Sequence, residues 1–284
     1  MKLLVATDLS ARSEQALDRA VAIATDAGAE LKILHVIDDS VPASARKVVA
    51  MAAETDILAD IARVAMRQNA SPAIQIAEGN VYKMILSAAE ETGCDLIVLG
   101  RHRIESCDAA FGGTTMGRVV RMGRRPVLVV ADRPAGAYRR VVVGMDFSEH
   151  ARQALGMALA IAPGAAFHLV HAFGVPFGGL LPGEATVREI CTERQRELGA
   201  LIDDETAAPS VPRRKGREIA GIARQGDVEG VLRQEINRIR PDLLVLGTHG
   251  RGVVAEAILG SVAQDFLNQP PCDLLIVRHT GEER

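Results

Sequence analysis

The sequence is poor in aromatic residues. Only 3% of its 284 residues are Phe, Tyr or Trp, and Trp is absent. The core must therefore be built from aliphatic side chains, and the stacking platforms that bind single-stranded nucleic acids are missing. The formal net charge of −3 gives no general attraction to polyanions. We therefore expect no nucleic-acid partner.

Cysteine is also scarce. The sequence has no CxxC pair, and its four cysteines are widely separated: Cys94, Cys107, Cys191 and Cys272. This pattern matches neither a disulfide framework nor a zinc site, and Cys94 and Cys272 border apolar runs that predict burial. No apolar run approaches the length of a membrane span, and Met1–Asp8 predicts a strand rather than a signal peptide. We expect a cytoplasmic protein without a membrane partner.

Common catalytic signatures are missing as well. The sequence contains no GxSxG, GxxxxGK[ST] or HExxH motif, and no nucleophile–base pair stands out. His35 and His171 occupy matching positions at the ends of apolar runs, without a carboxylate or cysteine partner in the sequence. We interpret both as structural. The sequence therefore predicts a binding protein rather than an enzyme, with a slow ATPase as the alternative.

What the sequence does contain is an internal repeat. Leu3–Ser10 recurs as Val141–Ser148, and the matching segments that follow occur in the same order in both halves. A repeat of this length indicates a duplicated domain. The join falls in residues 131–137, which have the composition of a linker. We predict one domain over residues 1–133 and a second over residues 138–284.

Each half alternates short apolar runs with helix-forming segments. In the first half the apolar runs lie at residues 3–7, 31–37, 73–77, 96–99 and 127–130. Ser10 and Ser148 follow the first run of each half and are suited to cap the next helix. The alternation predicts an α/β fold with a parallel sheet covered by helices on both faces. Such sheets bind ligands at the carboxyl ends of their strands.

Distinctive residues follow two predicted strands of the second half. Met145 and Asp146 come after its first strand, and Gly247 and Gly250 come at the end of its fourth. Gly260–Ser261, separated from Gly250 by nine residues, begins a predicted helix. Glycines let the backbone approach a ligand, and free N–H groups at a helix start favour an anion. The spacing predicts a phosphate site, with Asp146 accepting hydrogen bonds from a ribose or base.

This pattern, Gly-x2-Gly-x9-Gly-Ser after an apolar strand, resembles that of the universal stress protein family. The resemblance covers nearly the whole chain, once in each half. It implies two tandem Rossmann-like, adenine-nucleotide-hydrolase-like domains, each with a five-stranded parallel sheet of order 3-2-1-4-5. It also implies ATP as the ligand, with Mg²⁺ as an accessory ion. The two halves are expected to pair as an intramolecular pseudo-dimer, with a homodimer as a further option.

Carried over by position, the resemblance implies one nucleotide site in the second half. Its residues would be Met145, Asp146, Ala172, Leu246, Gly247, His249, Gly250, Arg251, Gly260, Ser261 and Val262. We interpret the protein as an ATP-binding stress-response regulator whose nucleotide sets its conformation or its choice of an unidentified protein partner. A non-catalytic interaction scaffold with a vestigial site is the alternative.

The first half departs from the pattern. Asp8, Gly100 and Gly113–Thr114 are kept, but Arg103 stands where the second glycine is expected. The Arg side chain needs the space in which the backbone would approach a phosphate, although its guanidinium group could itself bind an anion. We therefore predict that ATP binding is lost or altered in the first half.

Overall fold

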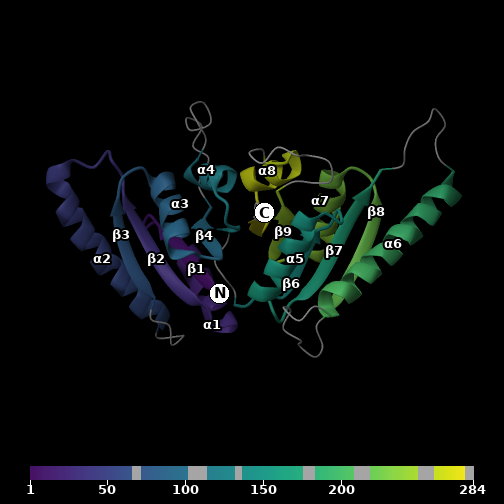
Figure 1. The fold of residues 1–284 in the computed structure, drawn as a ribbon, viewed down its shortest axis with the longest axis horizontal. Coiled ribbons are helices and arrows are strands. Elements are labelled where there is room, and N and C mark those ends of the chain that lie inside the picture. The colour runs from purple at the N-terminus through teal and green to yellow at the C-terminus, as the bar shows by residue number, and fades with distance from the viewer. Residues whose placement is uncertain are drawn as a thin grey trace. The chain divides into compact units, whose positions relative to one another are not determined.

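Runs rich in Val, Ile and Leu form the strands of the fold, and the segments between them form its helices (Figure 1). The computed structural model describes residues 1–65, 72–101, 114–131, 136–174, 183–207, 218–248 and 259–278. The chain divides into two compact units between Ala137 and Tyr138. We call the part up to Ala137 unit one and the part from Tyr138 unit two.

Unit one contains, in its described residues, a parallel sheet of strand order β3-β2-β1-β4-β5. Its strands are β1 (Lys2–Thr7), β2 (Glu30–Ile37), β3 (Ala73–Glu78), β4 (Leu96–Gly100) and β5 (Val127–Val130). Its helices are α1 (Ala11–Ala27), α2 (Ala43–Ala65), α3 (Val81–Thr92) and α4 (Thr115–Met122). The predicted order 3-2-1-4-5 is confirmed.

Unit two repeats this arrangement in the order β8-β7-β6-β9-β10. Its strands are β6 (Arg140–Gly144), β7 (Ala166–Phe173), β8 (Ile219–Gln225), β9 (Leu243–Gly247) and β10 (Asp273–Val277). Its helices are α5 (Glu149–Ile161), α6 (Glu184–Ala207), α7 (Val228–Ile239) and α8 (Ser261–Asn268). Figure 1 shows helices on both faces of each sheet.

The central strands are continuous apolar runs because both sheet faces are covered. In β1, Leu3, Leu4 and Val5 are all buried, and in β6 the run Val141–Val143 is buried as well. A half-exposed strand would instead alternate apolar and polar residues, since successive side chains point to opposite faces. The core of each unit therefore lies on both sides of its sheet.

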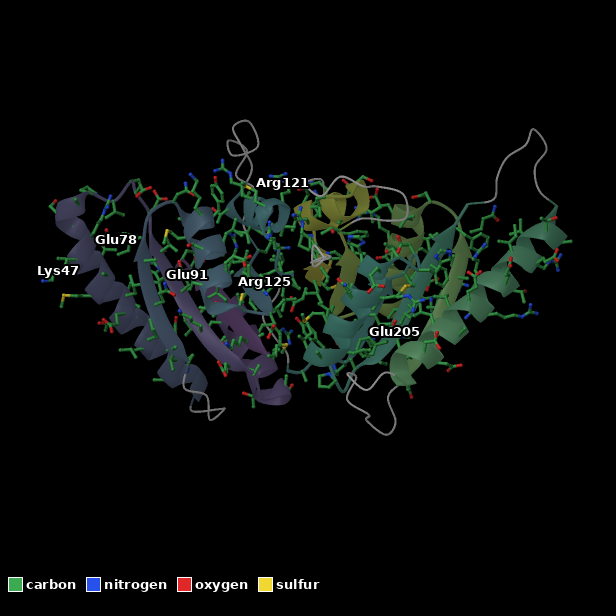
Figure 2. All side chains as sticks on the ribbon, viewed as in Figure 1. Lys47, Glu78, Glu91, Arg121, Arg125 and Glu205 are labelled. Carbon is green, nitrogen blue, oxygen red and sulfur yellow. The ribbon has the colours of Figure 1, made fainter. Side chains whose placement is uncertain are left out.

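Ion pairs between elements lie nearer the surface. Arg46 of α2 pairs with Glu78 of β3 at 3.3 Å, and Arg152 of α5 pairs with Glu205 of α6 at 3.1 Å. Figure 2 labels the two glutamates. Exposed pairs of this kind contribute about 0–1 kcal/mol each. The apolar cores, rather than these pairs, account for most of the stability.

The described cysteines are free thiols, with Cys94 and Cys272 buried as predicted and Cys191 half-buried. Burial raises the pKa of the Cys94 thiol to about 11. Cys107 lies outside the described residues. Within the described part of the chain, no helix combines the length and the apolar character that a membrane crossing requires.

Candidate functional site

The same turn follows the first strand of each unit. Asp8 Oδ1 accepts a hydrogen bond from the backbone N–H of Ser10 at 3.0 Å, and Asp146 Oδ1 accepts one from that of Ser148 at 3.0 Å. Through their hydroxyls, Ser10 and Ser148 cap α1 and α5, as the sequence predicted. Each aspartate therefore stabilises the start of a helix and lies at the carboxyl end of its sheet.

The residue inside this turn was not predicted from the sequence. Leu9 has a φ of 61° and Phe147 a φ of 62°. This left-handed conformation costs a bulky residue about 1–3 kcal/mol. The Phe147 ring contacts the ring of His171, with 4.7 Å between centroids. Leucine and phenylalanine rarely adopt a positive φ, so their residue types gave no sign of this conformation. Their matching positions in the two repeats were the one sequence feature that could have pointed to a shared turn.

His35 and His171 have matching backbone contacts. The Nδ1 atom of His35 lies 3.0 Å from the carbonyl oxygen of Thr7, and that of His171 lies 2.7 Å from that of Met145. A carbonyl oxygen can only accept a hydrogen bond, so Nδ1 carries the proton in both rings. Each ring connects the end of the second strand to the end of the first. These contacts support the structural interpretation of both histidines.

The Asp8 carboxyl group is partly buried, which by itself raises its pKa. Hydrogen bonds from Ser10 and Ser13 outweigh this effect, and the net pKa of Asp8 lies below its ordinary value. A negative charge therefore lies at the edge of the unit one sheet at neutral pH.

A cavity opens beside this charge at the carboxyl ends of the unit one strands. It has a volume of about 330 Å³, and Asp8, Arg12, Gly100, Arg101 and Met116 are among its lining residues. This volume is at the lower end of the range for small-molecule sites. Unit one thus keeps a space of ligand size at the predicted edge.

The loss or alteration of ATP binding in unit one stays a prediction. Arg103 and Gly113, on which it depends, lie outside the described residues.

Gly100 and Gly247 end the matching strands β4 and β9, and both face a helix. A Cβ atom on Gly100 would lie 2.7 Å from the carbonyl oxygen of Arg12, in the first turn of α1. A Cβ atom on Gly247 would lie 3.1 Å from the Cβ atom of His150 in α5. Gly247 therefore has a packing role, and its role in giving a ligand access to the backbone stays a prediction. The missing side chain makes room for the helix that follows the first strand.

The start of α8 differs from that of its counterpart α4. The N-cap of α4 is Thr114, whose Oγ1 accepts a hydrogen bond from the backbone N–H of Gly117 at 3.1 Å. The N-cap of α8 is Gly260, which has no side chain to accept such a bond. The backbone N–H of Gly260 itself donates to the carbonyl oxygen of Thr248 at 2.9 Å. In unit one, the N-cap side chain therefore supplies an oxygen atom to the start of α4. In unit two, the N-cap residue supplies no side-chain oxygen to the start of α8.

The predicted nucleotide residues that are described all lie at the carboxyl edge of the unit two sheet or at the start of α8. They are Met145 and Asp146 after β6, Ala172 in β7, Leu246 and Gly247 in β9, and Gly260, Ser261 and Val262 at α8. The remaining predicted residues, His249, Gly250 and Arg251, lie outside the described residues. Within the described ranges, no group of three or more His, Cys, Asp or Glu side chains is placed to hold a metal ion.

Comparison with known proteins identifies the repeat. The model of the Universal stress protein family matches residues 1–131 and again residues 137–278. The chain belongs to the universal stress protein family. Because the two matches follow one another, it is a tandem member with one family domain in each half. The resemblance inferred from the sequence is confirmed.

Two solved universal stress protein structures resemble the chain over almost its full length. A protein from Archaeoglobus fulgidus DSM 4304 has a TM-score of 0.69 at 19% identity, with 98% of each chain covered. A putative universal stress protein from Pseudomonas aeruginosa UCBPP-PA14 has a TM-score of 0.60 at 17% identity, with 98% of this chain and 92% of the other covered. At these identities the likeness shows the fold alone.

One relative with a similar amino-acid sequence aligns with half of the chain. The "Universal stress protein in QAH/OAS sulfhydrylase 3'region" of Thermus aquaticus is 32% identical over 143 residues. That alignment spans 50% of this chain and 99% of the relative. The tandem universal stress protein therefore has about twice the length of this relative.

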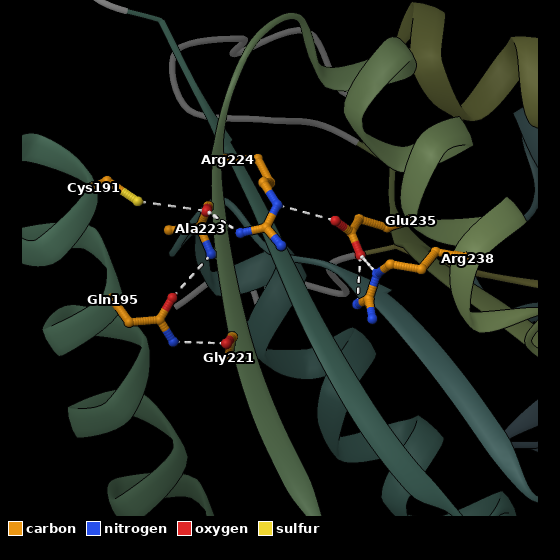
Figure 3. Close-up of polar contacts among 7 residues, drawn as sticks. All are labelled: Cys191, Gln195, Gly221, Ala223, Arg224, Glu235 and Arg238. Atoms are coloured by element: carbon orange, nitrogen blue, oxygen red, sulfur yellow. Dashed lines mark hydrogen bonds and ion pairs between the residues drawn. The ribbon is translucent and has the colours of Figure 1, made fainter. Parts of the chain in front are cut away.

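A buried carboxylate lies beside the candidate site in this universal stress protein (Figure 3). The side chain of Glu235 on α7 is only 2% exposed. Its Oε1 atom accepts a hydrogen bond from Arg224 Nε at 3.1 Å, and its Oε2 atom accepts one from Arg238 Nε at 2.6 Å. Arg224 is the register partner of Ala172, one of the predicted nucleotide residues. Sequence reasoning missed this cluster because Arg224 lies on β8, whereas Glu235 and Arg238 lie on α7.

Side chains of helix α6 form hydrogen bonds with backbone groups on the outer edge of β8, the edge strand of the unit two sheet (Figure 3). Gln195 Nε2 donates to the carbonyl oxygen of Gly221 at 2.6 Å, and its Oε1 atom accepts from the backbone N–H of Ala223 at 3.1 Å. Cys191 Sγ donates to the carbonyl oxygen of Ala223 at 3.6 Å. Edge groups paired in this way are not available to another strand.

His168 on β7 predicts a pH dependence of stability. Burial, together with the charge of Arg238, lowers the pKa of His168 below its ordinary value. On acidification the unfolded chain takes up a proton near pH 6.5, before the folded ring does. The free energy of unfolding should therefore decrease as the pH falls below about 6.5.

Urea unfolding at about pH 7.5 and about pH 5.5 measures this effect. His168→Gln should show a smaller decrease between the two pH values than the unchanged protein. An equal decrease in both proteins would assign the effect to other groups.

Proposed function

We propose that this universal stress protein binds ATP in unit two and that the bound nucleotide regulates its conformation or its choice of protein partner. The observation that carries this proposal is the start of α8. Its N-cap, Gly260, provides no side-chain oxygen, whereas Thr114 provides one to α4 in unit one. The positive end of a helix that lacks a side-chain cap favours an anion such as a phosphate.

The neighbouring residues suit the rest of a nucleotide. Ala172 is half-buried and offers apolar contact to a base, whereas Met145 is only 3% exposed. The carboxylate of Asp146 can accept hydrogen bonds from ribose hydroxyls. His249, Gly250 and Arg251 are assigned to the phosphates by the family motif. A Mg²⁺ ion bound with ATP would neutralise part of the phosphate charge. The chain itself supplies binding and orienting groups.

We assign a binding role rather than catalysis. Asp146 is the candidate base for a slow ATPase, but its Oδ1 atom accepts hydrogen bonds from the N–H and the hydroxyl of Ser148, at 3.0 Å and 2.5 Å. These bonds use the carboxylate to stabilise the turn into α5. They favour a positioning role for Asp146 over the activation of water.

The direct test is to denature the freshly purified full chain and identify the released nucleotide by mass spectrometry. We expect an adenine nucleotide at about one per chain, since only one half carries the complete motif. Added ATP should also raise the free energy of unfolding by about 4 kcal/mol when its concentration exceeds Kd about 1,000-fold. Neither released nucleotide nor stabilisation by ATP would contradict the proposal and favour a scaffold.

Matched substitutions locate the site. Gly260→Asp introduces a carboxylate that can cap α8 itself and repel a phosphate, so nucleotide binding should be lost. Thr114→Asp makes the equivalent change at α4 and should leave binding intact. Loss of binding in Thr114→Asp alone would place the nucleotide in unit one. Should Gly260→Asp not fold, as judged by circular dichroism, Gly250→Asp tests the same site.

A further inference from the structure

The outward face of α2 is apolar, although it lies against solvent. Val48 is 71% exposed, Met51 63% and Leu58 52%. Thr55 and Ala62 are also exposed and complete a row with alternating spacings of three and four residues. We call these five residues the α2 stripe. This spacing is the seam of a coiled coil, in which a helix packs along a second helix.

The opposite face of α2 already serves the core of unit one. Ala53 and Ile57 are buried, at 2% and 1% exposure. Since these residues attach the helix to its own unit, the α2 stripe is not needed for folding. Rows of large exposed apolar side chains on a soluble protein mark interaction surfaces.

The second repeat provides an internal comparison. Helix α6 has the same place in unit two that α2 has in unit one (Figure 1). Its exposed residues include Arg188, Thr192, Glu193 and Arg196, which are polar or charged. The fold therefore accepts a polar outward face at this position, and the apolar stripe is a property of α2 alone.

Two charged residues flank the α2 stripe on one side. Lys47 and Glu54 are both exposed and lie about two helical turns apart. Neither has an ion-pair partner among the described residues, and Figure 2 shows Lys47 pointing away from the sheet. When two copies of a helix pack antiparallel, each flank meets the same flank of the other copy. Lys47 of one copy then lies opposite Glu54 of the other, and the pair forms twice.

The same register also aligns the apolar residues. In this register the two-fold axis passes between positions 50 and 51, so Val48 and Met51 of one helix lie within one helical turn of Met51 and Val48 of the other. In a two-fold contact between identical chains, the same patch of each chain meets that of the other. The α2 stripe and its flanking charges fit such a contact, because the charges meet opposite charges and the apolar residues meet apolar residues. A different partner would need neither match.

We propose that α2 is an interface between two copies of this chain, which pack their α2 stripes as an antiparallel helix pair. The contact buries Val48 and Met51 and joins Lys47 to Glu54 across the two-fold axis. It is separate from the nucleotide site of unit two and does not depend on bound nucleotide.

Sedimentation equilibrium of the full chain over a range of protein concentrations tests the interface. The unchanged protein should self-associate, and Met51→Glu should reduce its mass to half and raise the dissociation constant at least about 100-fold. Thr192→Glu, the matched change on the exposed face of α6, should leave the mass unchanged. A protein that is monomeric at every concentration, or a Met51→Glu variant with unchanged mass, would overturn the proposal.

A charge exchange tests the antiparallel register. Lys47→Glu and Glu54→Lys should each raise the dissociation constant about tenfold, because each places like charges opposite one another. The double variant restores opposite charges and should associate like the unchanged protein. Both positions are exposed, so circular dichroism should show intact folds. A double variant as weak as the two single variants would overturn the proposed pairing.

Discussion

Replacing Gly100 with alanine is expected to lower the free energy of unfolding by about 3 kcal/mol. The added Cβ atom would lie 2.7 Å from the carbonyl oxygen of Arg12 and 2.9 Å from its carbonyl carbon. Both are backbone atoms in the first turn of α1, so no side-chain rotation can relieve the contact. Either α1 or the end of β4 must shift, which disturbs the packing of unit one.

Gly156→Ala provides the control. Gly156 lies inside α5, and a Cβ atom there would meet nothing within 4 Å. This substitution should raise the free energy of unfolding by about 1 kcal/mol, because alanine favours the helix more than glycine does. Urea unfolding followed by circular dichroism measures both variants. If Gly100→Ala is as stable as the unchanged protein, α1 is not held against β4 as described.

This contact changes how the motif glycines are interpreted. Gly100 is retained in unit one although Arg103 replaces the second motif glycine there, and the packing of α1 explains its retention. Gly247 has the same explanation in unit two. Packing thus accounts for these two glycines without a nucleotide, so the proposal for unit two depends mainly on the start of α8.

Removing both cations around Glu235 is expected to lower the free energy of unfolding by about 3–5 kcal/mol. The side chain of Glu235 is 2% exposed and has Arg224 at 3.1 Å and Arg238 at 2.6 Å as ion-pair partners. The double variant Arg224→Met/Arg238→Met removes both partners and leaves the carboxylate buried. Each single variant keeps one of these cations and should lose less. The reason is the cost of holding an unpaired charge away from water.

Adding Glu235→Leu to the double variant should restore most of the stability, since an apolar side chain needs no partner in this position. Chemical denaturation of the single, double and triple variants at neutral pH gives the comparison. A triple variant no more stable than the double one would show that the arginines act through packing rather than charge.

Much of the fold follows from local features of the sequence. The apolar run of β1 predicts a strand covered on both faces, and Ser10 and Ser148 predict the starts of α1 and α5. Each feature depends on residues within a few positions of one another, so chain order is sufficient to find it. The repeat then extends the same reasoning from one unit to the other.

The candidate site was predicted in part. Met145, Asp146 and Ala172 were placed correctly at the carboxyl edge of the sheet, because parallel strands end at the same edge. The packing role of Gly247 was missed, since its neighbour His150 belongs to a helix about a hundred residues earlier in the chain. Nothing in the sequence shows which helix approaches a strand end closely enough to require glycine.

The amino-acid sequence by itself therefore determined the duplication, the parallel strands and the motif that suggests a nucleotide. Only the tertiary structure decided that Glu235 is buried between two arginines, that Gly260 leaves α8 without a side-chain cap, and that the α2 stripe faces solvent. These properties depend on which elements pack together and at what distance. Arg238 is only three residues from Glu235, but the burial of Glu235 and its contact with Arg224 on β8 arise from the packing of α7 on the sheet, which chain order does not show.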